Sequence, residues 1–530
     1  MVAAGCPRAL LRQSAAQSRS FTLRRCMRPP VRLLALLACL VALTGLSACG
    51  SDDAGGALDS SLSYLPEDAP FAVAVDTDVD GDQYQALNAL FEKFPLGDAV
   101  REIVLRSLAK EATGVDLEKD VVPLLGNPFV VGAADASSFL GGSDGNGFVA
   151  AIRVSDEDEL QNLLESGDVT ERGEQSGAKI YEASGAEFAV DGDNVVFAGS
   201  RKLLDEALAR HDGDDTLDEE KFESNLEDVG DDGIAQGYVD IESLLAGSGA
   251  RDALKVKWIG AIQGIGLNAS VQDDSITIDF KIRTDPDGLS EEDLPIASGP
   301  EAPPIVERDG EVGIGVRDLG QIVSFVETVA QAVAPSAYGD YAAAKTQIEA
   351  RLDVDVEKDI LEQLSGDISA SISLEGKFGV RVEPKDPAAF ERTLEKISSA
   401  LPSLAEGLGF DDVTLVRPTG GEDFYALATA GGDSVVFGVK DGVFVITNDP
   451  DRADSLALDE PVPAAGQEGA IVVQADAEQI AIKLLEQLGD QIPVPPQLRP
   501  ALAAPLDLLT GSLKADTSGV SGTLRLGFDK

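Results

Sequence analysis

The chain has 530 residues, and its 93 acidic and 42 basic side chains give a net charge of −51 at neutral pH. So acidic a surface repels nucleic-acid phosphates, whose binding requires Lys and Arg to displace counterions, and we expect no nucleic-acid partner. All four cysteines lie at or before position 49, and His211 is the one histidine. This composition excludes the usual zinc sites and Cys–His chemistry. A Ser–His–acid triad would have to use His211, in an acidic stretch, so we expect a protein that is not an enzyme.

The N-terminal region has the pattern of a secretory leader. Several arginines precede an almost wholly apolar run over residues 33–46, and Ser47-Ala48-Cys49 follows. A basic segment, a short apolar segment and small residues at a cleavage site are typical of a signal peptide. The run is too short to span a bilayer, which needs roughly 20 apolar residues. With Leu46, these residues resemble the lipobox of bacterial lipoproteins, which implies cleavage before Cys49 and a diacylglyceryl group of the palmitate class on its Sγ.

Cys49 is therefore the predicted lipidation site and residues 1–48 the predicted signal peptide, although translation can also start at Met27. The alternative is an ordinary signal peptide in which a cysteine happens to follow the cleavage site. Removing residues 1–48 leaves 35 basic and 93 acidic residues, a net charge of −58. A lipid anchor, and not a basic surface, would then hold the protein on the outer face of the cytoplasmic membrane. We expect residues 49–62 to form a flexible tether.

The first predicted strand, Phe71–Val75, is followed by aspartates at alternating positions. They are Asp76, Asp78, Asp80 and Asp82. With Gly81 they resemble the first half of a calcium loop, but the position of the bidentate glutamate of an EF-hand is Leu87, on the apolar face of a helix. Two interpretations remain open. One is a weak calcium site, the single cofactor suggested here, and the other is a strand-to-helix connection in which Asp80 or Asp82 caps the helix.

Segments of the chain recur in the same order. Val115–Val122 and Val354–Leu361 are identical at five of eight positions. Asp191-Gly192 and Asp441-Gly442 each lie between apolar strands, which is a strong hairpin signal. Near the end of each copy, at 276–283 and 523–528, apolar and polar residues alternate. Strict alternation predicts antiparallel sheets with one apolar face on a core and one polar face in water.

Strands in hairpins that are interrupted by helices indicate an α+β fold. We predict two homologous repeats, 63–285 and 311–530, each an antiparallel sheet of hairpins with helices packed on it. Residues 286–310 are rich in Pro, Gly and Glu, and this composition predicts a linker.

The stretch Tyr64–Pro70, which runs into the strand Phe71–Val75 and is followed by Tyr84 and Phe91, resembles an uncharacterised bacterial family. Its members are often envelope lipoproteins and are described only by a domain of unknown function. The resemblance implies no catalytic residues. The sequence thus predicts a lipid-anchored extracytoplasmic protein, a non-catalytic binding or scaffolding module whose protein or small-ligand partner is unknown. The alternative is a carrier of an apolar or small ligand in a cleft between or within the repeats, which a large apolar cavity would favour.

Overall fold

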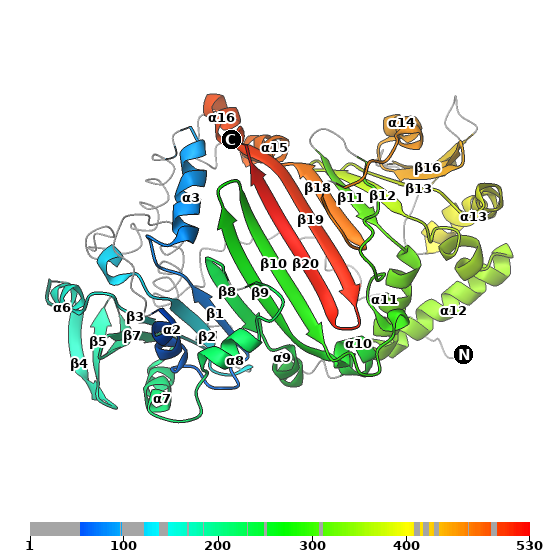
Figure 1. Ribbon diagram of the computed structural model, residues 1–530. Helices are drawn as coiled ribbons and strands as arrows, with labels where there is room; N and C mark the ends of the chain where they lie inside the picture. The colour runs from blue at the N-terminus through cyan, green and yellow to red at the C-terminus, as the bar shows by residue number, and fades with distance from the viewer. Residues whose placement is uncertain are drawn as a thin grey trace, which may run out of the picture.

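The computed structural model of the protein describes residues 54–95, 97, 121–136, 147–166, 169–183, 185–230, 232–248, 252–306, 311–407, 414–416, 423–428, 434–464, 466–488 and 496–529. Cys49, the predicted signal peptide and most of the repeated segment at 115–122 lie outside the described residues. Within the described part, both helices and a large antiparallel sheet are present, so the predicted α+β class is confirmed (Figure 1).

The strands and helices have the following bounds. The strands are β1 (Phe71–Val75), β2 (Phe129–Ala133), β3 (Phe148–Arg153), β4 (Val169–Gln175), β5 (Ala178–Ala183), β6 (Ala186–Asp191), β7 (Asn194–Ala198), β8 (Ala235–Val239), β9 (Ile262–Gln272), β10 (Ser275–Thr284), β11 (Glu311–Val316), β12 (Ile368–Ser373), β13 (Phe378–Val382), β14 (Thr414–Val416), β15 (Phe424–Ala428), β16 (Ser434–Lys440), β17 (Val443–Thr447), β18 (Ile471–Asp476), β19 (Leu506–Asp516) and β20 (Gly519–Phe528). The α-helices are α2 (Ala54–Leu62), α3 (Asp82–Lys93), α6 (Glu157–Ser166), α7 (Arg201–His211), α8 (Glu219–Ser224), α9 (Ile241–Ser248), α10 (Lys257–Gly260), α11 (Leu319–Val333), α12 (Pro335–Leu352), α13 (Pro387–Gly407), α14 (Ala453–Leu458), α15 (Ala477–Leu488) and α16 (Arg499–Ala503).

All of these strands pair into one continuous antiparallel sheet. From edge to edge the order is β4-β5-β6-β7-β3-β2-β1-β8-β9-β10, then β20-β19-β18-β11-β12-β13-β17-β16-β15-β14. Adding ten to each number in the first run gives the second run in reverse. The two runs meet where β10 pairs with β20 (Figure 1). We therefore describe the molecule as a first half, up to β10, and a second half, from β11.

Helices cover the outer parts of the sheet on both sides. On one side, α6 and α13 pack over the outer strands of the two halves through Leu160 and Phe390. On the other side, α2, α7 and α8 cover the first half and α14 covers the second. Each half thus has a core above and below its outer strands, while the strands where the halves meet are less covered.

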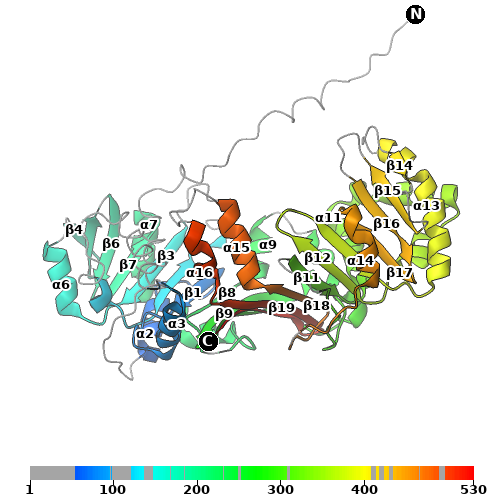
Figure 2. The ribbon, with the colours of Figure 1, turned by 90° about the horizontal axis from the view of Figure 1, so that it is seen from above.

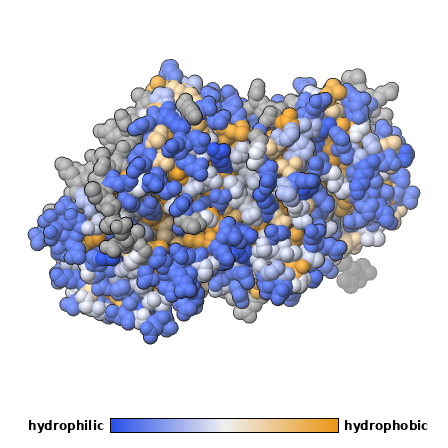
Figure 3. All heavy atoms as spheres, viewed as in Figure 1, coloured by the Kyte–Doolittle hydropathy of each residue, from blue (hydrophilic) through white to orange (hydrophobic). Residues whose placement is uncertain are grey.

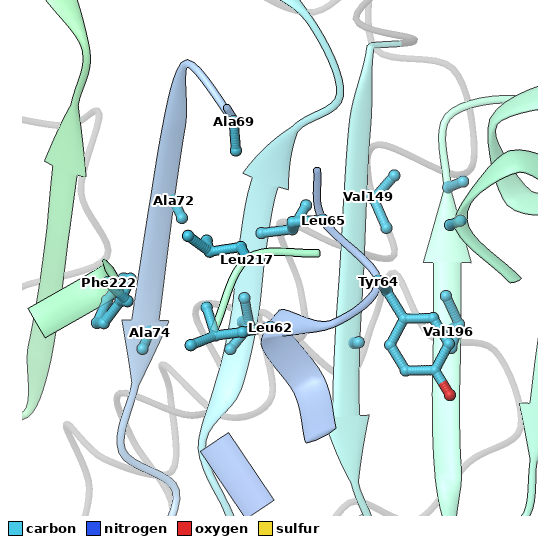
Figure 4. Packing of buried hydrophobic residues seen from close by; sticks show 14 of the residues in the cluster. Leu62, Tyr64, Leu65, Ala69, Ala72, Ala74, Val149, Val196, Leu217 and Phe222 are labelled. Carbon is cyan, nitrogen blue, oxygen red and sulfur yellow. The ribbon is translucent and has the colours of Figure 1, made fainter. Parts of the chain in front are cut away.

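Residues 54–62, which we expected to belong to a flexible tether, form helix α2. Leu62, Tyr64 and Leu65 are fully buried over β1, β2 and β3, where they meet Leu217 (Figure 4). Burying a large apolar side chain contributes about 1.5–3 kcal/mol. This packing outweighs the poor intrinsic helix propensity of the two glycines in α2, which is why composition suggested a tether.

The predicted linker 286–310 is also packed, as far as the structure describes it. Leu294 and Ile305 are fully buried, and Leu294 joins a cluster with Trp258 between the two halves. The Arg317 guanidinium donates to the main-chain oxygens of Ser298, Gly299 and Glu301. The connection is therefore held in place by these hydrogen bonds and by the burial of its few apolar residues.

Candidate binding surface

The predicted aspartates form turns between β1 and α3. The main-chain amide of Asp78 donates to Asp76 Oδ1 at 2.8 Å, and that of Asp80 donates to Asp78 Oδ1 at 3.0 Å. Gly81 is the N-cap of α3 and no side chain caps this helix, so the expectation that Asp80 or Asp82 does so is wrong. Burial raises the pKa of Asp76, with the neighbouring Asp78 charge acting in the same direction.

The same four aspartates do not converge on one point. Across the described part of the chain, no group of three or more His, Cys, Asp or Glu side chains is arranged to hold a metal ion. Carboxylate oxygens of Asp76 and Asp78 already accept hydrogen bonds from their own turns. We therefore assign these residues to the strand-to-helix connection.

The single histidine contacts a serine that sequence reasoning had not singled out. His211 Nδ1 lies 2.5 Å from Ser63 Oγ, 148 positions earlier in the chain, and the imidazole stacks on Tyr64 with 4.3 Å between ring centroids. Ser63 Oγ also lies within hydrogen-bond distance of the main-chain oxygen of Ser60, to which it donates at 2.7 Å. Tyr64 Oη in turn donates to Asp191 at 3.1 Å. This arrangement fastens the segment that follows α2 to the end of α7.

Within the part of the chain that the structure describes, an apolar surface that is only partly buried lies where the two halves meet. The strand registers place ten residues in one row on the same side of the sheet, and we call it the central apolar row. They are Val75, Ala235, Ala269, Ile278, Leu524, Gly511, Val473, Ile314, Ala370 and Val380. None of the ten is buried. With strands about 4.8 Å apart, the row is about 43 Å long.

The middle of the row is its most open part. Ile278 of β10 and Leu524 of β20 are direct cross-strand partners, and they are 41% and 44% exposed. On the other side of β9 and β10, Asn268 and Ser275 are buried. The expectation that the apolar side of these alternating strands packs on a core and the polar side faces water is therefore wrong at the centre of the sheet.

The row is bounded on all four sides. At its two ends it continues into covered cores, where Phe129 lies in the cluster of α6 and Phe437 in that of α13. Along one long side, Ile276 and Leu526 join a cluster with Leu90 of α3. Along the other, Ile282 and Val520 join a cluster with Trp258 and Phe325 of α11. The exposure thus has a physical cause, because the helices reach only the ends of the central strands.

Figure 2 shows α9, α11 and α15 on one side of these strands. On the other side of the sheet the central strands carry polar side chains. Thr523 Oγ1 donates to Asp279 Oδ1 at 2.6 Å across the β10–β20 pair. A pocket of about 470 Å³ beside β19 and β20 includes two ion pairs, Lys514–Glu468 and Arg525–Asp274. Because both cations already have carboxylate partners, this pocket offers little to bind an anion.

Figure 3 shows a face of the molecule on which hydrophilic residues predominate.

A second apolar feature lies between α11 and α12. A groove of about 460 Å³ is lined mainly by alanine, valine and tyrosine side chains, among them Val326, which is 57% exposed. Tyr341 Oη donates to Glu327 at 3.0 Å at the edge of the groove. None of the residues of α11 is buried.

Among the helices that the structure describes, none is both long and apolar enough to cross a membrane.

The sequence matches the family model described as a protein of unknown function (DUF3352) over residues 32–403, well over half of the chain. The chain belongs to the DUF3352 family. The matched region starts within the predicted signal peptide and ends in α13, so it extends into both halves of this DUF3352 protein. No curated protein sequence matches the chain.

Two crystal forms of TP0453 are similar to parts of this DUF3352 protein. Form III has 11% sequence identity and a TM-score of 0.23, and covers 42% of this chain and 79% of that one. Form IV has 12% identity and a TM-score of 0.22, with coverages of 44% and 83%. Similarity this low carries no argument about function.

Proposed function

We propose that this protein is a non-catalytic binding module on the outer face of the cytoplasmic membrane, with the central apolar row as its binding surface. The observation that carries the proposal is the exposed pair Ile278 and Leu524 within an apolar row across ten strands. Soluble proteins seldom expose a large contiguous apolar patch except where a partner or ligand binds. A row bounded on four sides by packed side chains has the shape of such a site.

Lipidation at Cys49 is the proposed means of attachment. The arginines, the apolar run and the small residues before Cys49 support it. The acidic composition supports it as well, because a chain with a net charge of −51 gains nothing from the anionic headgroups of a membrane. Two acyl chains hold a protein stably where a single chain does not.

We also infer that the two halves are tandem copies of one unit. The recurring sequence segments and the matching strand order support this inference. The pair β9–β10 and the pair β19–β20 have the same lengths, 11 and 10 residues. In both pairs two residues connect the strands. The central apolar row would then be a surface that arises only where the copies meet.

The second candidate function is that of a carrier for an apolar ligand. The feature that favours it is the lack of charge in the central apolar row, whose residues are all hydrocarbon or glycine. A scaffold for another protein would more often combine an apolar centre with a polar rim that forms hydrogen bonds.

Mass spectrometry of the protein from its own membranes tests both parts of the proposal. We expect an N-terminus at Cys49 that carries a diacylglyceryl group, and a Cys49→Ala variant that leaves the membrane fraction. An unmodified thiol at Cys49, or a chain that begins well after it, would contradict the anchor. Native spectra of the same preparation should show a retained ligand or partner. Ile278→Asp should lose it, and retention by Ile278→Asp would contradict the proposed surface.

A further inference from the structure

We propose that the central apolar row binds the acyl chains of a single diacyl lipid whose headgroup carries no net negative charge. This inference rests on the proposed function, because it names the ligand of the same surface.

The chemistry of the row favours hydrocarbon. The next row along the strands, in which Phe280 pairs with Leu267 and with Gly522, is apolar as well. The main-chain groups of the central strands are engaged in the sheet, so this surface offers no partner for a polar group of a ligand. An extended peptide here would bury amides without hydrogen bonds, at a cost of about 2–7 kcal/mol for each. An acyl chain has no such groups.

The dimensions of the open surface also suit acyl chains. The chains of one leaflet span about 15 Å, half of the hydrocarbon core of a bilayer, so a row of about 43 Å holds them at full length. Ile276 and Ile282 already belong to the side clusters, so the open strip comprises the two rows of Ile278 and Phe280, about 7 Å apart. A helix with its side chains is about 10–12 Å wide, so a helix is wider than this open strip.

The exposed pair Ile278 and Leu524 has small residues as its neighbours in the row. On either side of the pair Ile278–Leu524 lie small residues, Ala269 and Gly511. A Cβ at Gly511 would stand 3.4 Å from Leu524 Cδ1, so the leucine side chain already covers the glycine.

The charge of the chain restricts the headgroup of the lipid, and the cores at the two ends of the row argue against the bilayer itself as the occupant. A net charge of −51 repels anionic headgroups, which leaves zwitterionic and uncharged lipids. The cores of α6 and α13 at the two ends of the row would also keep a planar membrane away from its floor.

The test uses the mature chain with Cys49→Ser, so that its outcome does not depend on the anchor. The protein is incubated with phosphatidylethanolamine vesicles and separated from them, and the lipid that co-elutes with it is identified by mass spectrometry. We expect about one diacyl lipid per chain, at least tenfold less with Ile278→Asp or Leu524→Asp, and no change with Leu458→Asp. Leu458 is the matched control because it is 64% exposed on α14, away from the row. Equal melting temperatures show that the variants fold.

Several outcomes would overturn the proposal. They are the absence of lipid on the unaltered chain, equal lipid on Ile278→Asp, and co-flotation of the protein with intact vesicles in place of lipid transfer. Binding of an amphipathic Leu–Lys peptide helix without lipid would reassign the row to a helical partner. In that case the proposed binding module stands and the lipid assignment fails. If a partner retained in native preparations is insensitive to Ile278→Asp, the proposed surface itself fails.

Discussion

The first and second halves fill the same position on the sheet with different chemistry. Gly132 of β2 leaves space for Leu65, and a Cβ there would stand 2.5 Å from Leu65 Cδ1. At the corresponding place on β12, Ser371 accepts a hydrogen bond from Arg452 Nη2 at 2.8 Å. The first half therefore closes this side with hydrocarbon, whereas the second half closes it with a buried guanidinium.

The two solutions differ in what they contribute to stability. Arg452 is 8% exposed and pairs with Glu311 at 2.9 Å, but its Nε and Nη1 have no hydrogen-bond partner in the described part of the chain. A buried ion pair is often no better than apolar residues of the same volume, because two charges must be desolvated. The same strand order can therefore be covered by apolar side chains or by a buried ion pair, and the ion pair of the second half contributes less to stability.

The largest effect is expected from breaking the ion pair. Arg452→Ala leaves the Glu311 carboxylate buried without its partner and should lower the free energy of unfolding by about 3–5 kcal/mol in denaturant titrations. Arg452→Met combined with Glu311→Leu should restore most of the lost free energy of unfolding, because apolar side chains then replace the ion pair. A double variant as unstable as Arg452→Ala would show that the second half needs the charges.

Truncating the apolar filling of the first half should cost somewhat less. Leu65 is 1% exposed, and Leu65→Ala leaves a cavity over β2, so we expect a loss of about 3 kcal/mol in the same titration. Leu458→Ala, at an exposed position of α14, is the control and should change stability by less than about 0.5 kcal/mol. A loss no larger than that of the control would show that the packing of Leu65 over β2 contributes little to stability.

The helices that follow β1 and β11, namely α3 and α11, begin differently in the two halves, which gives a smaller test. Asp318 is the N-cap of α11 and accepts from the Gln321 amide at 3.3 Å, whereas the cap of α3 is Gly81. Asp318→Ala should cost about 1–2 kcal/mol, since it removes the cap and places alanine at a φ of 53°. Asp82→Ala, the control, removes no cap. Equal losses would mean that the cap of α11 has no effect.

The smallest effect concerns pH and Asp76, which has no counterpart among the turns of the second half. Burial raises the pKa of Asp76 in the folded state, so the folded protein holds its proton more tightly than the unfolded chain. Its contribution to stability is present below the unfolded pKa of about 3.9 and is lost as the pH rises through the folded pKa. Asp76→Asn should therefore stabilise the protein at pH 7 and lose this advantage in acid.

Denaturant titrations over that pH range measure the difference, and a stability gain that does not depend on pH would contradict the assignment. Calcium should leave both curves unchanged, because no three acidic side chains among the described residues are arranged to hold a metal ion.

Local features of the fold were predictable from the sequence. The predicted hairpin at Asp441-Gly442 is confirmed between β16 and β17, where the two residues have φ values of 50° and 85°. A hairpin also connects β6 and β7, but its two turn residues are Gly192 and Asp193, one position later than predicted, because Asp191 pairs with Asn194. These turns follow from two adjacent residues and the apolar strands beside them, so no distant contact is needed to specify them.

Features that depend on distant contacts were not predictable. The two expected sheets are one sheet because β10 pairs with β20, whose Thr523 is 244 positions from Asp279. Alternation correctly grouped Ile276, Ile278 and Ile282 on one side of β10. It could not show that only the ends of that side are covered, because this depends on where α3 and α11 pack.

The junction of β10 with β20 has a consequence for any attempt to separate the halves. A first half produced alone would present β10 as a ten-residue free edge, a template for pairing with another chain. Two such fragments that met in the register of the native pair would bring Asp279 opposite Asp279, and like charges directly opposite destabilise a sheet. In the intact chain Thr523 stands there instead. Because the two halves are joined in one chain, the edge at β10 pairs with β20, which suits it better than a second copy of the first half.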